Sequence, residues 1–194
     1  MMTRWLAVIL LALAGQSVGS AAEMRSIDVK YEDGFYTLVS VVWFDAGPRS
    51  MFDVFSSWDL SEQFSGAVVE ARDLEADELG RPGFFVINRG CVVFFCKSLT
   101  RQGYVEIEDE KVLRAFADPA LSDFRVSNES WEFAEESGGT VVRYTLLMQP
   151  DFWVPPAIGP YLIKRKLKTD GGQALNRIEA IAKTYDDSGE IIID

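Results

Sequence analysis

The sequence predicts an α+β domain in which one curved antiparallel β-sheet wraps around a single long C-terminal helix, with two short helices after the first strand. The run from 35 to 44 is rich in β-branched and aromatic residues, and apolar residues recur at helical spacing directly after it. From 67 to 150, short apolar runs alternate with turn residues without an intervening long helix, which is typical of an antiparallel meander. The amphipathic stretch 155–185 is then the element left to cover the apolar face of the sheet.

The N-terminus has the pattern of a cleavable secretory signal peptide. Arg4 is followed by an uncharged apolar run from Trp5 to Ala14, about ten residues long, and Ser20-Ala21-Ala22 fits the small-x-small rule for cleavage. An uncleaved anchor helix is the alternative, but a membrane span needs roughly 20 apolar residues, and polar residues interrupt this run too early. We therefore expect residues 1–22 to be removed and the mature protein, from Glu23, to be periplasmic or secreted.

Length and charge narrow the class of protein further. Removal of 22 of the 194 residues leaves 172, which suits one domain at 23–185 followed by a flexible acidic tail at 186–194. The formal charge is −11, or −12 once Arg4 is removed, and this argues against nucleic-acid binding, which needs a basic footprint. Because the chain contains no histidine, serine-histidine catalysis, cysteine-histidine catalysis and nearly all common catalytic zinc sites are excluded. We expect no metal and no cofactor.

The first strand and the two short helices are predicted from local signals. The strand spans Phe35–Phe44 and ends at the breaker Asp45-Ala46-Gly47-Pro48, whose proline is well placed to open a helix. Apolar residues at 51, 52, 54, 55 and 58 have helical spacing. Asp59 is expected to cap a second short helix, which ends at Gly66.

Seven further strands are predicted, separated by turn residues that include Arg89-Gly90 and Thr100-Arg101-Gln102. They are Ala67–Leu74, Gly83–Asn88, Cys91–Leu99, Gly103–Ile107, Val112–Ala117, Phe124–Phe133 and Val141–Met148. Cys91 and Cys96 bracket the most strand-like tetrapeptide of the chain. A strand of that length spans about 16 Å, whereas bridged Cα atoms lie within about 7 Å. The pair is therefore either a disulfide closed over a bulge, which an oxidising compartment favours, or two buried thiols.

The order of the elements and two local stretches resemble the SRPBCC superfamily, also called START-like or Bet v 1-like, with its polyketide cyclase/dehydrase and coenzyme Q-binding branches. Val41–Pro48 followed by Met51–Phe55 is similar to the first strand and first helix of that family. Tyr144–Pro150 followed by Trp153–Pro156 is similar to its last strand and the entry to its closing helix. The resemblance covers roughly 27–184. It implies the helix-grip fold, which binds lipids, sterols, polyketides or quinones between sheet and helix and has no universal catalytic residue.

A cavity between the sheet and the long helix is the first candidate site. Strand alternation and the amphipathic helix give a set of inward-facing residues that we expect to line it. They are Phe85, Ile87, Phe94, Trp131, Phe133, Tyr144, Leu146, Met148, Leu162, Leu175 and Ile178. The alternative is that the same residues fill a solid core, since aromatic stripes are usually core. Gly171-Gly172 either leave room for a ligand or mark a kink, and each weakens the helix by about 1 kcal/mol relative to alanine.

An apolar, proline-stiffened loop followed by a basic cluster is the second candidate site. The cluster is the densest positive charge in an acidic chain, and an apolar wedge beside basic residues is how a peripheral protein docks on anionic lipid. We expect this edge to contact a membrane and to gate ligand entry. The alternative is a buried proline corner that leads into a helix with a solvated basic face. The residues concerned are Phe152, Trp153, Ile158, Lys164, Arg165, Lys166 and Lys168.

Three functions stay open at the level of the sequence. The favoured one is an exported binding protein for an apolar small molecule of the lipid, isoprenoid or quinone type. The second is a cyclase/dehydrase-like enzyme acting on a hydrophobic or polyketide-like substrate. Its polar chemistry would rest on groups such as Asn88 and Tyr144, with Arg143 facing solvent, and no acid–base pair stands at a recognisable spacing. The third is a ligand-free module that binds a partner protein through the edge near Trp153.

Overall fold

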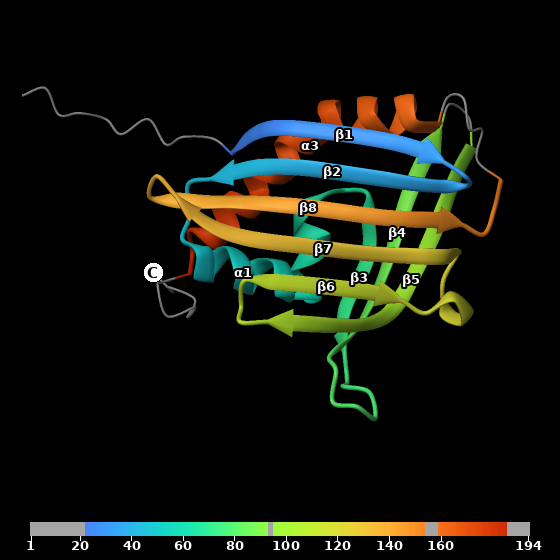
Figure 1. Cartoon of the computed structure of the whole chain (residues 1–194), viewed down its shortest axis with the longest axis horizontal. Helices are drawn as coiled ribbons and strands as arrows, with labels where there is room; N and C mark the ends of the chain where they lie inside the picture. Colours follow the sequence, from blue (N-terminus) through green and yellow to red (C-terminus); the bar gives the residue numbers. More distant parts are fainter. Residues whose placement is uncertain (1–21, 93–94, 154–158, 186–194) are drawn as a thin grey trace, which may run out of the picture.

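The computed structural model describes residues 22–92, 95–153 and 159–185, which form one curved sheet with helices packed against its concave side (Figure 1). The predicted acidic tail and all of the predicted signal peptide except Ala22 lie outside these residues. Among the helices in this part of the chain, none is both long enough and apolar enough to cross a membrane.

Eight antiparallel strands form the sheet in the order β1-β2-β8-β7-β6-β5-β4-β3. They are β1 (Glu23–Glu32), β2 (Phe35–Phe44), β3 (Val68–Leu74), β4 (Gly83–Val92), β5 (Phe95–Glu108), β6 (Val112–Ala117), β7 (Phe124–Glu136) and β8 (Gly139–Pro150). From β3 to β8, strands that follow one another in the chain pair with one another, so the predicted meander is confirmed. The last strand, β8, also pairs with β2, which joins the two ends of the chain in one sheet.

Strand β1 was missing from the sequence-based prediction. It is an edge strand that pairs with β2 alone, in a register from Glu23 opposite Trp43 to Glu32 opposite Phe35. Its charged residues and high exposure leave little of the hydrophobic alternation that identifies a strand. The Asp33-Gly34 turn does carry a hairpin signal, because both residues have positive φ angles, 50° and 87°, as a two-residue hairpin turn requires.

The prediction of one strand at Cys91–Leu99 is wrong, because a hairpin divides it. Strand β4 ends at Val92, β5 begins at Phe95, and the backbone of Cys91 lies directly opposite Cys96. Cys96 is disulfide-bonded, so the distance argument against a bridge, which assumed an extended strand between the two cysteines, does not apply. The predicted turn at 100–102 is also wrong, since β5 continues through it.

The helices match the prediction in order but not in every boundary. They are α1 (Pro48–Ser56), η1 (Trp58–Leu60), α2 (Ser61–Phe64), η2 (Pro119–Leu121) and α3 (Gly159–Ala182). Asp59 does not cap α2; its carboxylate instead accepts a hydrogen bond of 3.1 Å from the amide of Asp73 in β3. Proline at the start of α1 fulfils the expected role.

The hydrophobic core lies between the concave face and the helices. Met51 and Val54 of α1 are fully buried, and the ring of Trp58 stacks on Phe84 of β4 with centroids 4.3 Å apart. Ile178 from the C-terminal half of α3 joins the same core. Helix α3 therefore closes the concave side, packing along β1 and against α1 and α2 (Figure 1).

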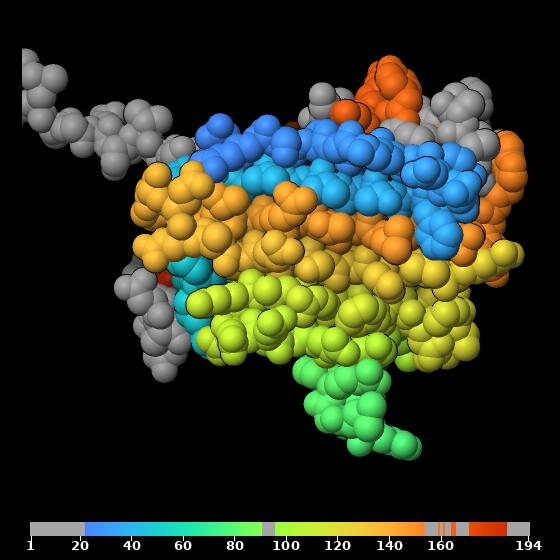
Figure 2. Space-filling view, viewed as in Figure 1, coloured from blue at the N-terminus to red at the C-terminus, as the bar shows by residue number. Residues whose placement is uncertain are grey.

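The loop between β3 and β4 projects from the body of the molecule (Figure 2). Its turn is braced by Asp77, whose Oδ1 accepts hydrogen bonds of 2.9 Å from the amides of both Leu79 and Arg81. The guanidinium of Arg81 lies 3.5 Å over the ring centroid of Tyr104, which ties the loop back to the sheet.

Candidate functional site

The concave face of the central strands gathers most of the predicted cavity residues that the structure describes. Trp131 lies opposite Tyr144 in the β7–β8 register, with ring centroids 5.2 Å apart. Phe133 lies two residues further along β7 and is buried in the same core. Leu146 and Met148 alternate with Tyr144 along β8, so they share its face.

Phe85 and Ile87 do not belong to this face. Phe84 and Val86 are the buried residues of β4, and strand alternation places Phe85 and Ile87 on the opposite, convex side. The guanidinium of Arg72 lies 3.9 Å over the ring centroid of Phe85 there. The prediction that these two side chains face the interior is wrong, because the inward-facing residues of β4 are shifted by one position. Both faces of β4 are apolar, so the sequence does not show which set of alternate residues faces inward.

Helix α3 places two of its three predicted residues against the core. Ile178 is buried in it and Leu175 packs against it. Phe94 lies outside the described residues, and the side chain of Leu162 is likewise outside them.

Packing along β8 changes from tight to loose. Val142 is 2 % exposed, but the neighbours on the same face further along, Tyr144, Leu146 and Met148, keep part of their surface uncovered although β8 is flanked on both sides by other strands. A central strand beneath a helix is normally covered completely. The incomplete packing is therefore consistent with room for a ligand at this end of the concave face.

A polar cluster occupies this otherwise apolar region. Arg101 of β5 and Glu129 of β7 form an ion pair, with only 16 % and 4 % of their side chains exposed. A guanidinium nitrogen of Arg101 also donates to Oδ1 of Asn88 in β4, at 3.4 Å. The phenol of Tyr144 lies within the electrostatic reach of Arg101. Strands β4, β5, β7 and β8 together position these four side chains.

The electrostatics favour hydrogen-bond donation by the cluster. Burial raises the pKa of Tyr144 to about 12, against a smaller opposing effect of the Arg101 charge. Burial also lowers the pKa of Arg101, and the carboxylate of Glu129 compensates its charge. At neutral pH Tyr144 therefore stays a protonated phenol, which is able to donate a hydrogen bond. A carbonyl or hydroxyl oxygen of a bound molecule fits this arrangement best.

Arg101 and Glu129 were not among the residues predicted from the sequence. Glu129 follows the period-2 alternation of Trp131 and Phe133, so the phase of β7 was a usable signal for an inward carboxylate. Arg101 lies in Thr100-Arg101-Gln102, which the sequence pattern predicts as a turn. Its buried partner on β7 is distant in sequence.

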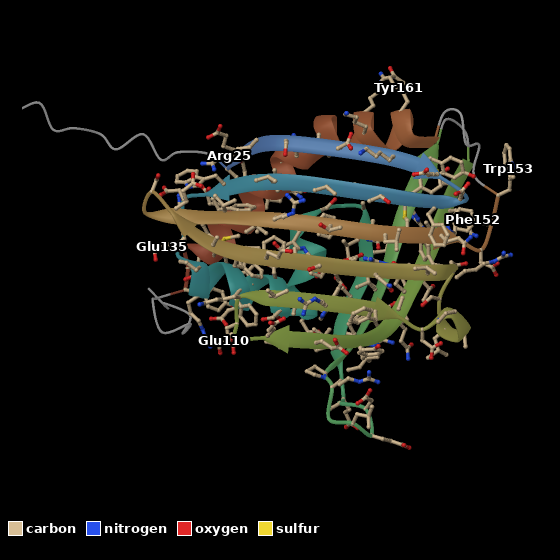
Figure 3. All side chains as sticks on the ribbon, viewed as in Figure 1. Arg25, Glu110, Glu135, Phe152, Trp153 and Tyr161 are labelled. Carbon is tan, nitrogen blue, oxygen red and sulfur yellow. The ribbon has the colours of Figure 1, made fainter. Side chains whose placement is uncertain are left out.

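A second feature is an open hollow of about 350 Å³ near the end of β8. It is lined by Tyr31, Gly34, Tyr36, Arg125, Gln149, Pro150, Asp151, Phe152 and Trp153. Figure 3 shows Phe152 and Trp153 at this end of the molecule, and Tyr161 at the start of α3. Trp153 is 81 % exposed and Tyr161 is 65 % exposed.

The predicted membrane edge is described only in part. Phe152 is half-buried, with Lys97 Nζ 3.8 Å from its ring centroid, and Lys164 lies 4.0 Å from the carboxylate of Asp28. Arg165 is exposed. Ile158 and the side chains of Lys166 and Lys168 lie outside what the structure describes. In the part that is described, no group of three or more acidic or cysteine side chains is arranged to hold a metal ion.

Comparison with known proteins identifies the fold. No sequence-family profile matches the chain, and no curated protein sequence does. The structure is similar to a START superfamily protein from Mycobacterium smegmatis, with a TM-score of 0.59, 13% identity, and coverage of 76% of this chain and 97% of that chain.

Two further solved structures give the same result. The STAR-related lipid transfer protein of Xanthomonas axonopodis matches with a TM-score of 0.58, 14% identity, and coverage of 80% of this chain and 98% of that chain. The Zhui aromatase/cyclase of a Streptomyces species matches with a TM-score of 0.56, 11% identity, and coverage of 81% of this chain and 99% of that chain. The chain therefore has a START-like helix-grip fold, as the sequence resemblance implied.

Proposed function

We propose that this protein binds an amphipathic, largely apolar molecule of the lipid, isoprenoid or quinone type between the concave face of the sheet and α3. The observation that carries the proposal is the buried Arg101–Glu129 ion pair on the same face of the sheet as the Trp131–Tyr144 ring pair, which sets polar groups within an aromatic face. Sites for small molecules commonly combine an apolar lining with a few such groups. The likeness in fold to a protein described as a STAR-related lipid transfer protein supports the same class of ligand.

Two forces would hold such a ligand. Burial of its apolar part contributes about 25 cal/mol per Å² before the costs of association. A carbonyl or hydroxyl group at its polar end would accept hydrogen bonds from the Tyr144 phenol and the Arg101 guanidinium, which fixes its orientation.

Native mass spectrometry of the protein purified from its own host, followed by solvent extraction and lipid analysis, tests this function. We expect one apolar adduct per chain, carrying an oxygen-containing polar end. Protein that stays free of adduct, under gentle ionisation and from several growth conditions, and that also fails to take up lipid from extracts of the same cells, would reject it.

We further propose that the end of the molecule near Trp153 contacts a membrane and controls ligand entry. The large exposed surfaces of Trp153 and Tyr161, and the basic residues that follow Tyr161 in the sequence, support this, because aromatic and basic side chains favour the membrane interface. Flotation with anionic vesicles tests it. Trp153→Ala, and a variant with Lys164, Arg165, Lys166 and Lys168 changed to glutamate, should each lose binding, while Arg25→Glu on β1 should keep it.

A cyclase-like enzyme is the second candidate, supported by the likeness in fold to an aromatase/cyclase and by the presence of a buried phenol that could protonate a substrate. It predicts turnover of a polyketide-like substrate, which a binding protein would not show. A ligand-free partner-binding module, the third reading, predicts a stable protein complex that is lost in Trp153→Ala and an interior without a ligand.

We also propose that the protein is exported and acts in the periplasm or outside the cell. The signal pattern of the N-terminus supports this, as does the disulfide at Cys96, since such bonds persist in oxidising compartments. The intact mass of protein recovered from fractionated cells tests it. A chain that begins at Glu23 is expected, and a full-length chain found in the cytoplasm would contradict export.

A further inference from the structure

The hollow near the end of β8 has aromatic walls that are held in place. The rings of Tyr31 and Tyr36 lie with centroids 4.8 Å apart at the β1–β2 turn. Phe152 is fixed by Lys97, 3.8 Å from its centroid, and by Phe124, whose ring meets it edge-on at 6.1 Å. Trp153 follows directly and leaves most of its indole exposed. Aromatic faces of this kind attract weakly positive C–H groups as well as apolar surface.

The polar groups of the hollow carry no net charge. Arg125 Nε donates to Asp151 Oδ1 at 2.6 Å, so these two charges neutralise one another. The amide of Asp151 donates to the carbonyl of Asp123 at 3.0 Å, which anchors the pair to the start of β7. Gln149 adds a carboxamide, which both donates and accepts hydrogen bonds. A bound anion or cation would find no uncompensated partner among these lining residues.

We propose that this hollow is a second binding site, distinct from the interior cluster, and that it takes a neutral sugar ring. The C–H face of a sugar would stack on Trp153 or Tyr31, and its hydroxyl groups would exchange hydrogen bonds with Gln149 and with the Arg125–Asp151 pair. The volume of about 350 Å³ is enough for a small ligand of one or two rings. The interior cluster is not involved, so failure of the hollow to bind a sugar would leave the ligand proposed for the concave face untouched. Trp153 is shared with the proposed membrane contact, and Gln149→Leu, which belongs to the hollow alone, separates the two.

Titration with methyl β-D-glucopyranoside, followed by ¹H–¹⁵N NMR, tests the site. We expect saturable shifts of the Trp153 indole N–H, the Gln149 side-chain amide and the Gly34 backbone amide. Trp153→Ala and Gln149→Leu should each weaken binding at least fivefold. Tyr161→Ala removes another exposed aromatic residue, which does not line the hollow, and should change the affinity less than twofold. Circular dichroism and thermal melting would confirm that each variant is folded.

Two further probes decide the chemistry and the source of the sugar. Inorganic phosphate and choline chloride should leave the same signals unmoved, and displacement of the glucoside by either would overturn the neutral-sugar assignment. Vesicles containing monoglucosyl diacylglycerol distinguish a lipid headgroup from a free sugar. If the sugar is a lipid headgroup, Gln149→Leu should bind these vesicles more weakly than the unaltered protein does. If the natural ligand is a free sugar, the two proteins should bind them equally. The proposal would be overturned if none of these signals shifts at glucoside concentrations up to about 50 mM. A dissociation constant of about 50 mM is the weakest that a small neutral ligand of this kind should show.

Discussion

At the scale of single residues, the ion pair between Arg101 and Glu129 is the main buried polar interaction that we describe on the concave face. Most of both side chains is out of contact with solvent, so each depends on the other for compensation of its charge. Replacing both partners by apolar residues of similar volume is often neutral or stabilising, whereas removing one leaves an unpaired buried charge. An ion pair in this position is therefore not needed for stability as such, which fits a role in recognition.

The first prediction concerns the loss of one partner. Glu129→Gln keeps the shape of the side chain but leaves the Arg101 charge uncompensated, and should lower the free energy of unfolding by about 3–5 kcal/mol. Urea unfolding measures this. Glu132→Gln, on the exposed side of the same strand, is the control and should change it by less than about 1 kcal/mol. Equal unfolding midpoints for the two variants would show that the pair is not buried as the structure describes.

The second prediction concerns the phenol of Tyr144. Its pKa of about 12 lies above the value near 10 of an unfolded chain, so the folded protein holds the proton more tightly. The stability gained is present below pH 10 and is lost as the pH rises towards 12, by an amount of the order of 2 kcal/mol.

Unfolding by urea at several alkaline pH values measures the effect. Tyr144→Phe should lose less stability between pH 10 and pH 12 than the unaltered protein does. Its absorbance titration at 295 nm should lack one group that titrates near pH 12. Identical pH profiles for the two proteins would contradict the raised pKa of Tyr144.

At the scale of elements, β5 depends on a glycine for its close approach to β6. A Cβ at Gly103 would come within 1.9 Å of the Phe116 carbonyl oxygen and 2.8 Å of the Ala117 Cα, both backbone atoms that cannot move aside alone. Glycine is used where one backbone must approach another closely. The 14-residue strand bends visibly around the helices in Figure 1, and Gly103 lies within it.

The third prediction follows from that contact. Gly103→Ala should destabilise the fold by about 1–3 kcal/mol, because β5 and β6 must separate locally to admit the methyl group. Thermal melting is a sufficient measurement, since each kcal/mol lowers the Tm of a domain of this size by roughly 2–4 °C. Gly66→Ala has open space around its Cβ and should leave the Tm within a degree or two. A Tm for Gly103→Ala as high as that of Gly66→Ala would contradict the close approach.

The elements also show how far a sequence-based prediction reaches. Strand β2 and strand β6 were predicted with their observed bounds, because each is a mainly apolar run bounded by strong turn residues. The hairpin at 92–95 was missed because hydrophobic residues continue through it, which periodicity alone cannot separate from a strand. The prediction of which side chains face the interior was correct where polar residues marked the outer face of a strand, as at Tyr144. It was wrong where both faces were apolar, as at Phe85.

At the scale of the whole molecule, α3 is fastened at its C-terminal half to the junction of β2 and α1. Glu179 is buried, and its carboxylate accepts a hydrogen bond of 2.9 Å from the Asp45 amide. Lys183 Nζ contacts Glu179 at 3.0 Å and Asp45 at 2.8 Å. These partners raise the pKa of Lys183. Ile178 and Ala182 add buried apolar contacts beside this clasp.

The position of the clasp bears on how a ligand would reach the concave face. The clasp and the hollow near Trp153 are associated with opposite ends of α3, since Glu179 lies near its C-terminus and Tyr161 near its start. If a ligand enters near Trp153, as proposed, the clasp would keep the C-terminal half of α3 attached during entry.

The last prediction tests the clasp by hydrogen exchange. Glu179→Ala removes the acceptor of the Asp45 amide, which should then exchange at least tenfold faster, together with amides of 175–182, as this end of α3 opens locally. Amides between β6 and β7 should keep their rates, because they share no contact with the clasp. Gln173→Ala, an exposed change on the same helix, should leave all of these rates unaltered. If exchange accelerates equally throughout the sheet in Glu179→Ala, the clasp supports the entire fold, and α3 cannot be treated as a separately opening element.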